Sequence, residues 1–115
     1  LTLALNYSAR WEITEAMRKA AQLVSEGNLS STDINEAKVS SLLATSHMPD
    51  PELLIRTSGE HRISNFLLWQ IAYTELYFSD VYWPDFERED FYNAIIDFQH
   101  RERRFGKISE QLTHP

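Results

Sequence analysis

The densest group of polar and charged side chains in the sequence lies between residues 56 and 65. It reads Arg56-Thr57-Ser58-Gly59-Glu60-His61-Arg62-Ile63-Ser64-Asn65. Guanidinium groups pair with phosphate oxygens through two parallel hydrogen bonds, and the first N–H groups of a helix provide further donors. Two arginines around a glycine loop, followed by a serine at an expected helix start, therefore indicate a site for a diphosphate. The residues alone equally allow Arg56 and Arg62 to pair with Glu52, Glu60 or Glu75 in a structural network.

Two further side chains near this cluster could contact a metal ion. Glu75 lies between an expected helix and an expected strand, and Mg²⁺ prefers one or two carboxylates together with substrate phosphates and waters. An ion pair between Glu75 and a nearby arginine is the alternative interpretation. His61 could ligate a metal or donate to a phosphate, but it could also be an ordinary exposed loop histidine. The 4 histidines include no pair at the spacing of a zinc site, so the sequence does not predict one.

The spacing of apolar residues predicts strands that alternate with helices. Three segments have the apolar or aromatic content of strands: 1–7, 52–56 and 75–81. Four segments have helical spacing or helix-start signals: 12–25, one that begins after Ser30–Asp33, 64–71, and one that contains 91–98. Gly27 supplies the stop after the first helix. This order predicts an α/β fold, with a mostly parallel sheet flanked by helices.

The fold class assigns a place to the polar cluster. Ligands of parallel α/β sheets bind beyond the carboxyl ends of the strands, and the loop after Arg56 follows such an end. Three parallel strands make a thin sheet with an exposed apolar edge, so further strands are expected from an upstream segment or from another chain.

Composition limits the possible partners. The 115 residues carry 11 Lys and Arg against 17 Asp and Glu, which gives a net charge of −6. A protein that wraps a nucleic-acid backbone is expected to be basic, so no nucleic-acid partner is predicted and any anion site must be local.

The sequence has no cysteine, which fits the reducing cytoplasm. Because the sequence starts at Leu1 in an apolar segment, we expect it to be part of a longer polypeptide.

Several motifs, in the same order, closely resemble the C-terminal half of the undecaprenyl diphosphate synthases, which are cis-prenyltransferases. These motifs are Asn6–Ile13, Leu54–Gln70, Glu75–Phe78, Trp83–Phe86 and Arg101–Gly106. The resemblance runs almost from end to end, and it is more specific than any single motif.

The resemblance implies an α/β enzyme that acts as a homodimer. It would add isopentenyl diphosphate units in cis to farnesyl diphosphate, with Mg²⁺, and so make undecaprenyl diphosphate, the lipid carrier for cell-wall glycans. Residues 1–115 would be the C-terminal part of a single cis-prenyltransferase domain. The family's catalytic segment, which binds the allylic diphosphate, would lie upstream, so this chain alone is expected to be inactive. The expected location is the cytoplasm, peripherally at the inner membrane face, because the product associates with the membrane.

The resemblance also implies roles for particular residues. Arg56, Arg62 and Ser64 correspond to the residues that bind the headgroup of isopentenyl diphosphate. Arg104 and Gly106 correspond to an Arg-x-Gly motif that reaches the diphosphate across the dimer interface.

Two more residues correspond to metal contacts of the family. Glu75 matches the C-terminal Mg²⁺ carboxylate, and His61 matches an auxiliary contact to the metal or the diphosphate.

Two other functions stay open: a non-catalytic partner subunit of a heteromeric cis-prenyltransferase, and a generic phosphate-binding α/β module. Such partner subunits commonly lose headgroup residues, so the presence of Arg56, Arg62 and Ser64 together with Glu75 favours the catalytic function.

Overall fold

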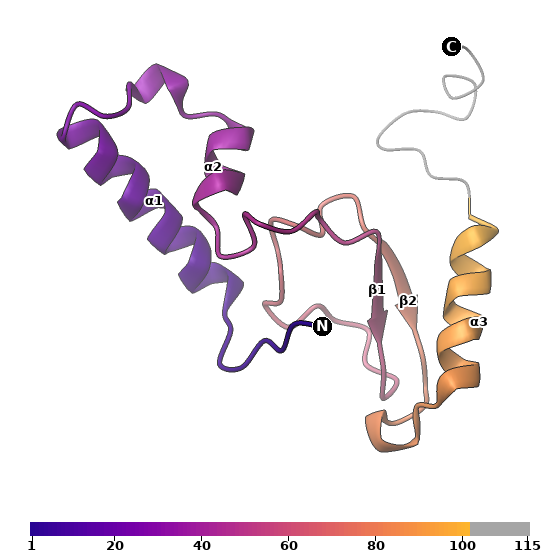
Figure 1. Cartoon of the computed structure of the whole chain (residues 1–115). Coiled ribbons are helices and arrows are strands. Elements are labelled where there is room, and N and C mark those ends of the chain that lie inside the picture. The colour runs from indigo at the N-terminus through magenta and orange to yellow at the C-terminus, as the bar shows by residue number, and fades with distance from the viewer. Residues whose placement is uncertain (102–115) are drawn as a thin grey trace, which may run out of the picture. The chain divides into compact units, whose positions relative to one another are not determined.

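The computed structural model describes residues 1–101 and contains three α-helices, two strands and two 3₁₀ turns in that range (Figure 1). In chain order these are α1 (Ala9–Ser25), a 3₁₀ turn (Ser31–Asp33), α2 (Glu36–Leu42), β1 (Leu53–Arg56), β2 (Glu75–Phe78), a 3₁₀ turn (Trp83–Asp85) and α3 (Arg88–Gln99). The chain divides into two compact units. The first unit comprises Leu1–Asp50 and Ile63–Ala72, and the second comprises Pro51–Arg62 and the chain from Tyr73 onward. None of the helices in residues 1–101 is both long and apolar enough to cross a membrane.

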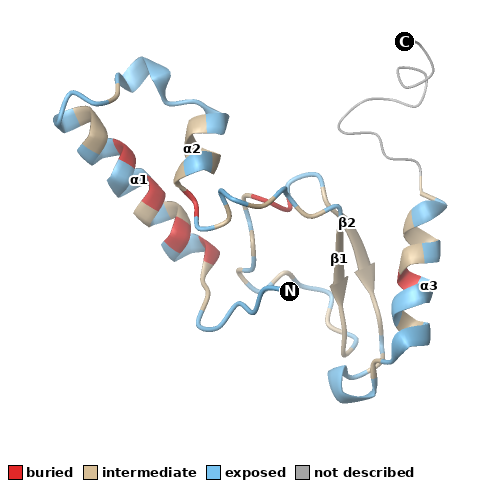
Figure 2. Cartoon of the chain, in the orientation of Figure 1, coloured by how far each residue is buried: buried red, intermediate tan, exposed pale blue. Residues whose placement is uncertain are grey.

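Helix α1 confirms the first helical prediction and begins three residues earlier than the apolar spacing indicated. Ser8 has an extended backbone, and its hydroxyl accepts a hydrogen bond from the backbone N–H of Trp11, which is the usual role of a residue at a helix start. Gly27 has φ of 73° and ends the helix as predicted. The buried residues repeat every three to four positions and so form one stripe, seen in red in Figure 2: Ala9, Glu12, Ala16 and Ala20.

Helix α2 packs against α1 in the first unit. Its start is set by Asn35, whose side-chain oxygen accepts a hydrogen bond from the N–H of Lys38 at 2.9 Å. Leu43 follows the helix and is buried. The predicted second helix is therefore confirmed, with only 7 residues. Its cap is Asn35, and the predicted start at Ser30–Asp33 is wrong, because Ser31–Asp33 form a separate 3₁₀ turn.

Strands β1 and β2 form a parallel pair, which confirms the predicted parallel pairing. Leu53 pairs with Glu75 at the amino end of the pair and Arg56 pairs with Phe78 at its carboxyl end. Strand β2 ends three residues before the predicted Val81. The N–H of Ser79 donates to the carbonyl oxygen of Arg56 at 2.8 Å, and the chain then turns.

The predicted strand over residues 1–7 is wrong. These residues form no strand, Leu1, Leu3 and Leu5 are exposed, and Asn6 has φ of 56°. The apolar pattern shows side chains that suit a buried strand, but a strand also requires a neighbour for its backbone hydrogen bonds. Within residues 1–101, only β1 and β2 pair with each other.

The predicted helix over residues 64–71 is also wrong. This segment is a series of turns in which Ser64, Asn65 and Leu67 have φ of 54°, 59° and 48°. Left-handed residues interrupt the repeat of an α-helix. The carbonyl oxygen of Asn65 accepts a hydrogen bond from Ala9 of α1, at 3.0 Å. Contacts with another element therefore overrule the local apolar spacing.

Helix α3 confirms the last predicted helix and lies beside β2 in the second unit (Figure 1). It begins with a capping box, in which the side chains of Glu87 and Asp90 each accept a hydrogen bond from the other's backbone N–H. Ala94 is fully buried on its inner face. The parallel pair and the helix that covers it confirm the α/β fold class.

Candidate functional site

The loop after β1 is fastened to the segment that follows β2. The N–H of Ser58 donates to the carbonyl oxygen of Val81 at 2.8 Å, and the N–H of Gly59 donates to that of Ser79 at 2.9 Å. Ser58 and Gly59 have φ of 69° and 64°. A Cβ at Gly59 would lie 3.3 Å from a side-chain oxygen of Asp80, so a glycine suits the position in both conformation and space. The loop between Arg56 and Arg62 is thus held at the carboxyl edge of the sheet.

Arg56 and Arg62 are in different electrostatic environments within the second unit. The Nε of Arg56 is buried and has no hydrogen-bond partner among residues 1–101. A buried donor without a partner costs about 1–3 kcal/mol, and a phosphate oxygen would remove that cost. Arg62 forms an ion pair with Glu60, and its side chain is 66% exposed. Pairs this exposed contribute about 0–1 kcal/mol, so the contact with Glu60 can be exchanged for a contact with an anion.

His61 lies at the same edge of the sheet as this loop. Its ring packs against Phe78 at the end of β2, with 4.8 Å between ring centroids. The side chain is otherwise exposed. This position leaves the imidazole accessible to a ligand at the carboxyl edge.

Glu75 lies at the opposite edge of the sheet, where its partner in register is Leu53. A strand rises about 3.3 Å per residue, so Glu75 is about 10 Å along β2 from Phe78, against which His61 packs. Among residues 1–101, no three His, Asp or Glu side chains gather closely enough to hold a metal ion. Within this chain, the structure therefore does not bring the two predicted metal contacts together.

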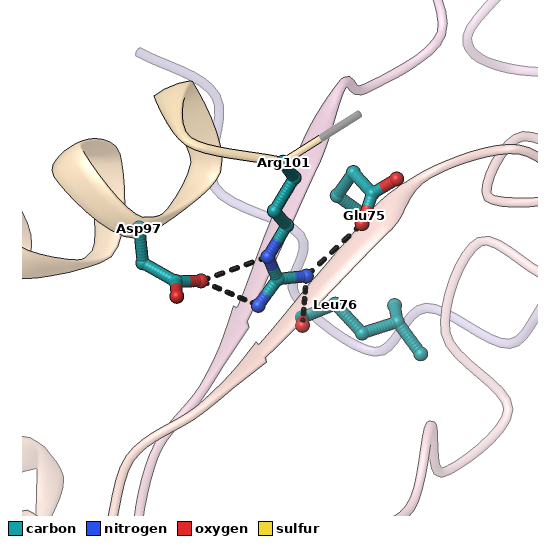
Figure 3. A network of polar contacts seen from close by, with 4 residues as sticks. All are labelled: Glu75, Leu76, Asp97 and Arg101. Carbon is teal, nitrogen blue, oxygen red and sulfur yellow. Dashed lines mark hydrogen bonds and ion pairs between the residues drawn. The ribbon is translucent and has the colours of Figure 1, made fainter. Parts of the chain in front are cut away.

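Arg101 binds Glu75 and connects α3 with β2 (Figure 3). Its Nη1 donates to Oε2 of Glu75 at 3.0 Å and to the carbonyl oxygen of Leu76 at 2.8 Å, while its Nε donates to Asp97 at 2.8 Å. The hydrogen bond with Glu75 raises the pKa of Arg101, partial burial opposes the rise, and Asp97 adds to it. The ion pair with an arginine, which the sequence allowed as an alternative for Glu75, is present.

A magnesium ion fits this position only in part. Arg101 binds Oε2 of Glu75, which leaves Oε1 as the oxygen that could accept another ligand. Mg²⁺ often takes one protein carboxylate and completes its octahedron with waters and substrate phosphates. The donor chemistry of Glu75 is therefore suitable, while the remaining ligands would have to come from outside residues 1–101.

Replacing Arg101 with methionine should lower the free energy of unfolding by about 1–2 kcal/mol, because charged hydrogen bonds to partly buried groups are lost. Side-chain exposure of Arg101 and Glu75 is 30% and 28%, so solvent screens their pair only partly. Urea unfolding followed by circular dichroism measures the change. Arg18→Met is the matched control, since Arg18 pairs with Glu15 but is 69% exposed. Equal losses in the two variants would contradict the prediction.

Ser64 lies in the first unit, in the turn segment 63–72, and its side chain is exposed. The other predicted site residues that the structure describes lie in the second unit: Arg56, His61, Arg62 and Glu75. Arg104 and Gly106 lie outside the described residues.

The sequence interpretation missed a buried polar network around Glu12. This carboxylate is 4% exposed and accepts hydrogen bonds from the hydroxyl of Tyr7, from the N–H of Ala44 at 2.9 Å and from Nε2 of Gln70 at 3.1 Å. Burial, together with the bond to Glu12, raises the pKa of Tyr7 above its usual range. A signal was present, because Glu12 lies one turn before Ala16 on the apolar stripe of α1, where a carboxylate needs partners.

The comparisons with known proteins agree with the fold and motifs. Residues 1–106 match the family model of prenyltransferases described as "Putative undecaprenyl diphosphate synthase". An isoprenyl transferase of Chlorobaculum tepidum is 58% identical over 112 residues, which is 97% of this chain and 42% of that protein. A ditrans,polycis-undecaprenyl-diphosphate synthase of Pseudomonas putida, named as specific for (2E,6E)-farnesyl diphosphate, is 54% identical over 97% of this chain and 45% of its own length.

A solved structure is similar as well. The lavandulyl diphosphate synthase of Lavandula x intermedia, in complex with dimethylallyl diphosphate, matches with a TM-score of 0.89 and 44% identity over 91% of this chain and 45% of that one. The chain thus spans less than half the length of these relatives. With the family model matched over nearly all of its length, the chain belongs to the undecaprenyl diphosphate synthase family of cis-prenyltransferases.

Proposed function

We propose that this chain works as the carboxyl-terminal part of an enzyme that adds isopentenyl diphosphate units in cis to farnesyl diphosphate and makes undecaprenyl diphosphate. The observation that carries the proposal is the 54% identity over 112 residues with the Pseudomonas putida synthase of that name. The chain would supply the isopentenyl diphosphate site and would be inactive without the upstream part of the enzyme.

In this proposal, Arg56, Arg62 and Ser64 bind the headgroup of isopentenyl diphosphate. The buried Nε of Arg56, which lacks a partner among residues 1–101, supports an anion at this place. Arg62 has a solvent-exposed guanidinium that can leave Glu60 for a phosphate. Arginine suits the task because its planar donors match two phosphate oxygens at once.

In each elongation step one carbon–oxygen bond breaks and one carbon–carbon bond forms. The bond between C1 of the allylic substrate and its diphosphate oxygen breaks, the double bond of isopentenyl diphosphate attacks C1, a proton is lost from the added unit, and diphosphate leaves. C1 becomes positively charged on the way, so the enzyme must hold two diphosphates in register and stabilise their charges. Arg56 and Arg62 would fix one of the two headgroups.

The enzyme would use Mg²⁺ as its cofactor. Glu75 is the carboxylate of this chain that would hold the ion, and His61 would be an auxiliary contact to the ion or the diphosphate. Bound Mg²⁺ would neutralise diphosphate charge. Because Glu75 and His61 lie at opposite edges of the sheet, the proposal requires that further groups complete the site.

The remaining parts of the proposal concern assembly and location. We infer a homodimer in which Arg104 and Gly106 belong to the Arg-x-Gly motif that reaches the diphosphate of a partner's site. The enzyme would be cytoplasmic and peripheral at the inner face of the membrane, where its long apolar product must go.

The test is incorporation of radiolabelled isopentenyl diphosphate into polyprenyl products, with farnesyl diphosphate as acceptor and Mg²⁺ present. The complete polypeptide that carries this chain should elongate the acceptor, whereas residues 1–115 alone should not. Inorganic diphosphate should compete with isopentenyl diphosphate less well than an isoprenoid diphosphate does. Equal competition would favour a generic phosphate-binding module, and elongation only after a second subunit is added would favour a partner subunit.

A further inference from the structure

We propose that Asn65 is a positioning residue for the isopentenyl diphosphate site, because it fastens the turn that carries Ser64 to the first turn of α1. This inference rests on the proposed function, in which the Ser64 hydroxyl contacts the headgroup. Asn65 itself would not touch the substrate.

Asn65 forms three hydrogen bonds with consecutive residues at the start of α1. Its carbonyl oxygen accepts from the N–H of Ala9 at 3.0 Å, and its Oδ1 accepts from the N–H of Arg10 at 2.9 Å. Its Nδ2 donates to the hydroxyl oxygen of Ser8 at 2.9 Å. The first N–H groups of a helix have no partner within the helix, so Asn65 satisfies two of them at once.

The backbone of the turn explains why such fastening is needed. Ser64 and Asn65 are adjacent, and both have left-handed φ values, 54° and 59°. Residues with a Cβ adopt this conformation reluctantly, although asparagine does so more readily than most, and it persists where the surroundings impose it. The bonds from Asn65 to Ser8, Ala9 and Arg10 supply that constraint one residue after Ser64. The exposed Ser64 hydroxyl is therefore held in a defined place, free to meet a ligand.

A second set of hydrogen bonds, made by Gln70, holds the turn segment to α1, so the role of Asn65 can be tested without unfolding the unit. Five residues further along the same turn segment, Nε2 of Gln70 donates to the buried Glu12 of α1 at 3.1 Å and to Oγ1 of Thr45 at 2.9 Å. The segment therefore stays attached to α1 when the side chain of Asn65 is shortened. Loss of Asn65 should disturb the local orientation of Ser64 without unfolding the first unit.

The experiment compares Asn65→Ala with Asn35→Ala in the complete polypeptide that carries this chain. Asn35 also satisfies a helix start, at α2, through one hydrogen bond from the N–H of Lys38, and that bond involves no residue of the turn that carries Ser64. Asn65→Ala should raise KM for isopentenyl diphosphate by about tenfold to a hundredfold, because small displacements of a binding group have effects of this size. KM for farnesyl diphosphate should stay unchanged, and Asn35→Ala should change neither value.

A double-mutant cycle with Ser64→Ala decides whether Asn65 acts through Ser64. If it does, Asn65→Ala should raise KM much less in the Ser64→Ala background than in the native one. Equal effects in both backgrounds, or an unchanged KM in Asn65→Ala, would overturn the inference while leaving the proposed function intact. If Ser64→Ala itself leaves KM for isopentenyl diphosphate unchanged, the proposed role of Ser64 fails and the inference falls with it. Thermal melting of each variant identifies any effect that comes from unfolding.

Discussion

Replacing Arg56 with alanine should lower kcat/KM for isopentenyl diphosphate by about a hundredfold or more in the complete polypeptide, mostly through KM. Arg56 is the last residue of β1, and its buried Nε has no partner among residues 1–101. In the proposed function a phosphate takes that place, and the loss of a charged hydrogen bond to a phosphate costs about 1.5–3 kcal/mol per bond. Steady-state elongation rates at varied isopentenyl diphosphate measure the change.

Two variants make the Arg56 result specific. Arg56→Lys keeps the positive charge but loses the planar pair of donors, so it should recover only part of the activity. Arg18→Ala removes an exposed guanidinium from α1 and should leave the kinetics unchanged. Unchanged turnover in Arg56→Ala would exclude Arg56 from the headgroup site.

Glu12→Ala should have the largest effect on stability, a loss of about 2–3 kcal/mol in the free energy of unfolding. The substitution removes an acceptor from three donors: the hydroxyl of Tyr7, the N–H of Ala44 and the amide of Gln70, which keeps its second bond to Thr45. Gln70 is buried, Tyr7 is half-buried and Ala44 is exposed. A buried donor that loses its partner costs about 1–3 kcal/mol, and a donor that water reaches costs less. Urea unfolding of the complete polypeptide that carries this chain measures the loss.

The control for Glu12 is Glu15→Ala on the same helix. Glu15 pairs with Arg18 near the surface, so its loss should cost less than about 1 kcal/mol. Similar losses for the two variants would mean that the network around Glu12 contributes little. A loss confined to Glu12→Ala would mean that this carboxylate connects α1 with the chain around Ala44 and Gln70.

The elements that depend on local signals could be predicted from the sequence. Helix α1 was predicted from its apolar stripe and from the stop at Gly27, which lie in or next to the helix, whereas its cap at Ser8 was missed and its start was predicted three residues late. Helix α3 was predicted from its apolar spacing, and its capping box was not anticipated. Strands β1 and β2 were predicted because short apolar runs between turn residues leave few other choices.

The elements that depend on distant partners could not be predicted. Residues 1–7 have the side chains of a strand, but the sequence does not say which backbone would pair with them. The turn over residues 64–71 follows from bonds between Asn65 and α1, which cross more than fifty positions of the sequence. The spacing of apolar residues does not indicate hydrogen bonds between residues so far apart in the sequence.

For the candidate site, too, local features were identifiable from the sequence and distant partners were not. The residue types around Arg56 and Gly59 indicated an anion site, since their chemistry and the strand that positions them are close together in the sequence. The ion pair of Glu75 was anticipated as an alternative, but its partner Arg101 is 26 positions away and becomes identifiable only when α3 packs on β2.

The division into two units limits where this chain can be joined to a homologue. Each compact unit is made of two separate stretches, and the chain passes from one unit to the other after Asp50, Arg62 and Ala72. If this chain were joined to a homologue at any one of these boundaries, at least one unit would contain one stretch from each parent. A hybrid with a homologue joined at one of these boundaries is therefore expected to be less stable than either parent.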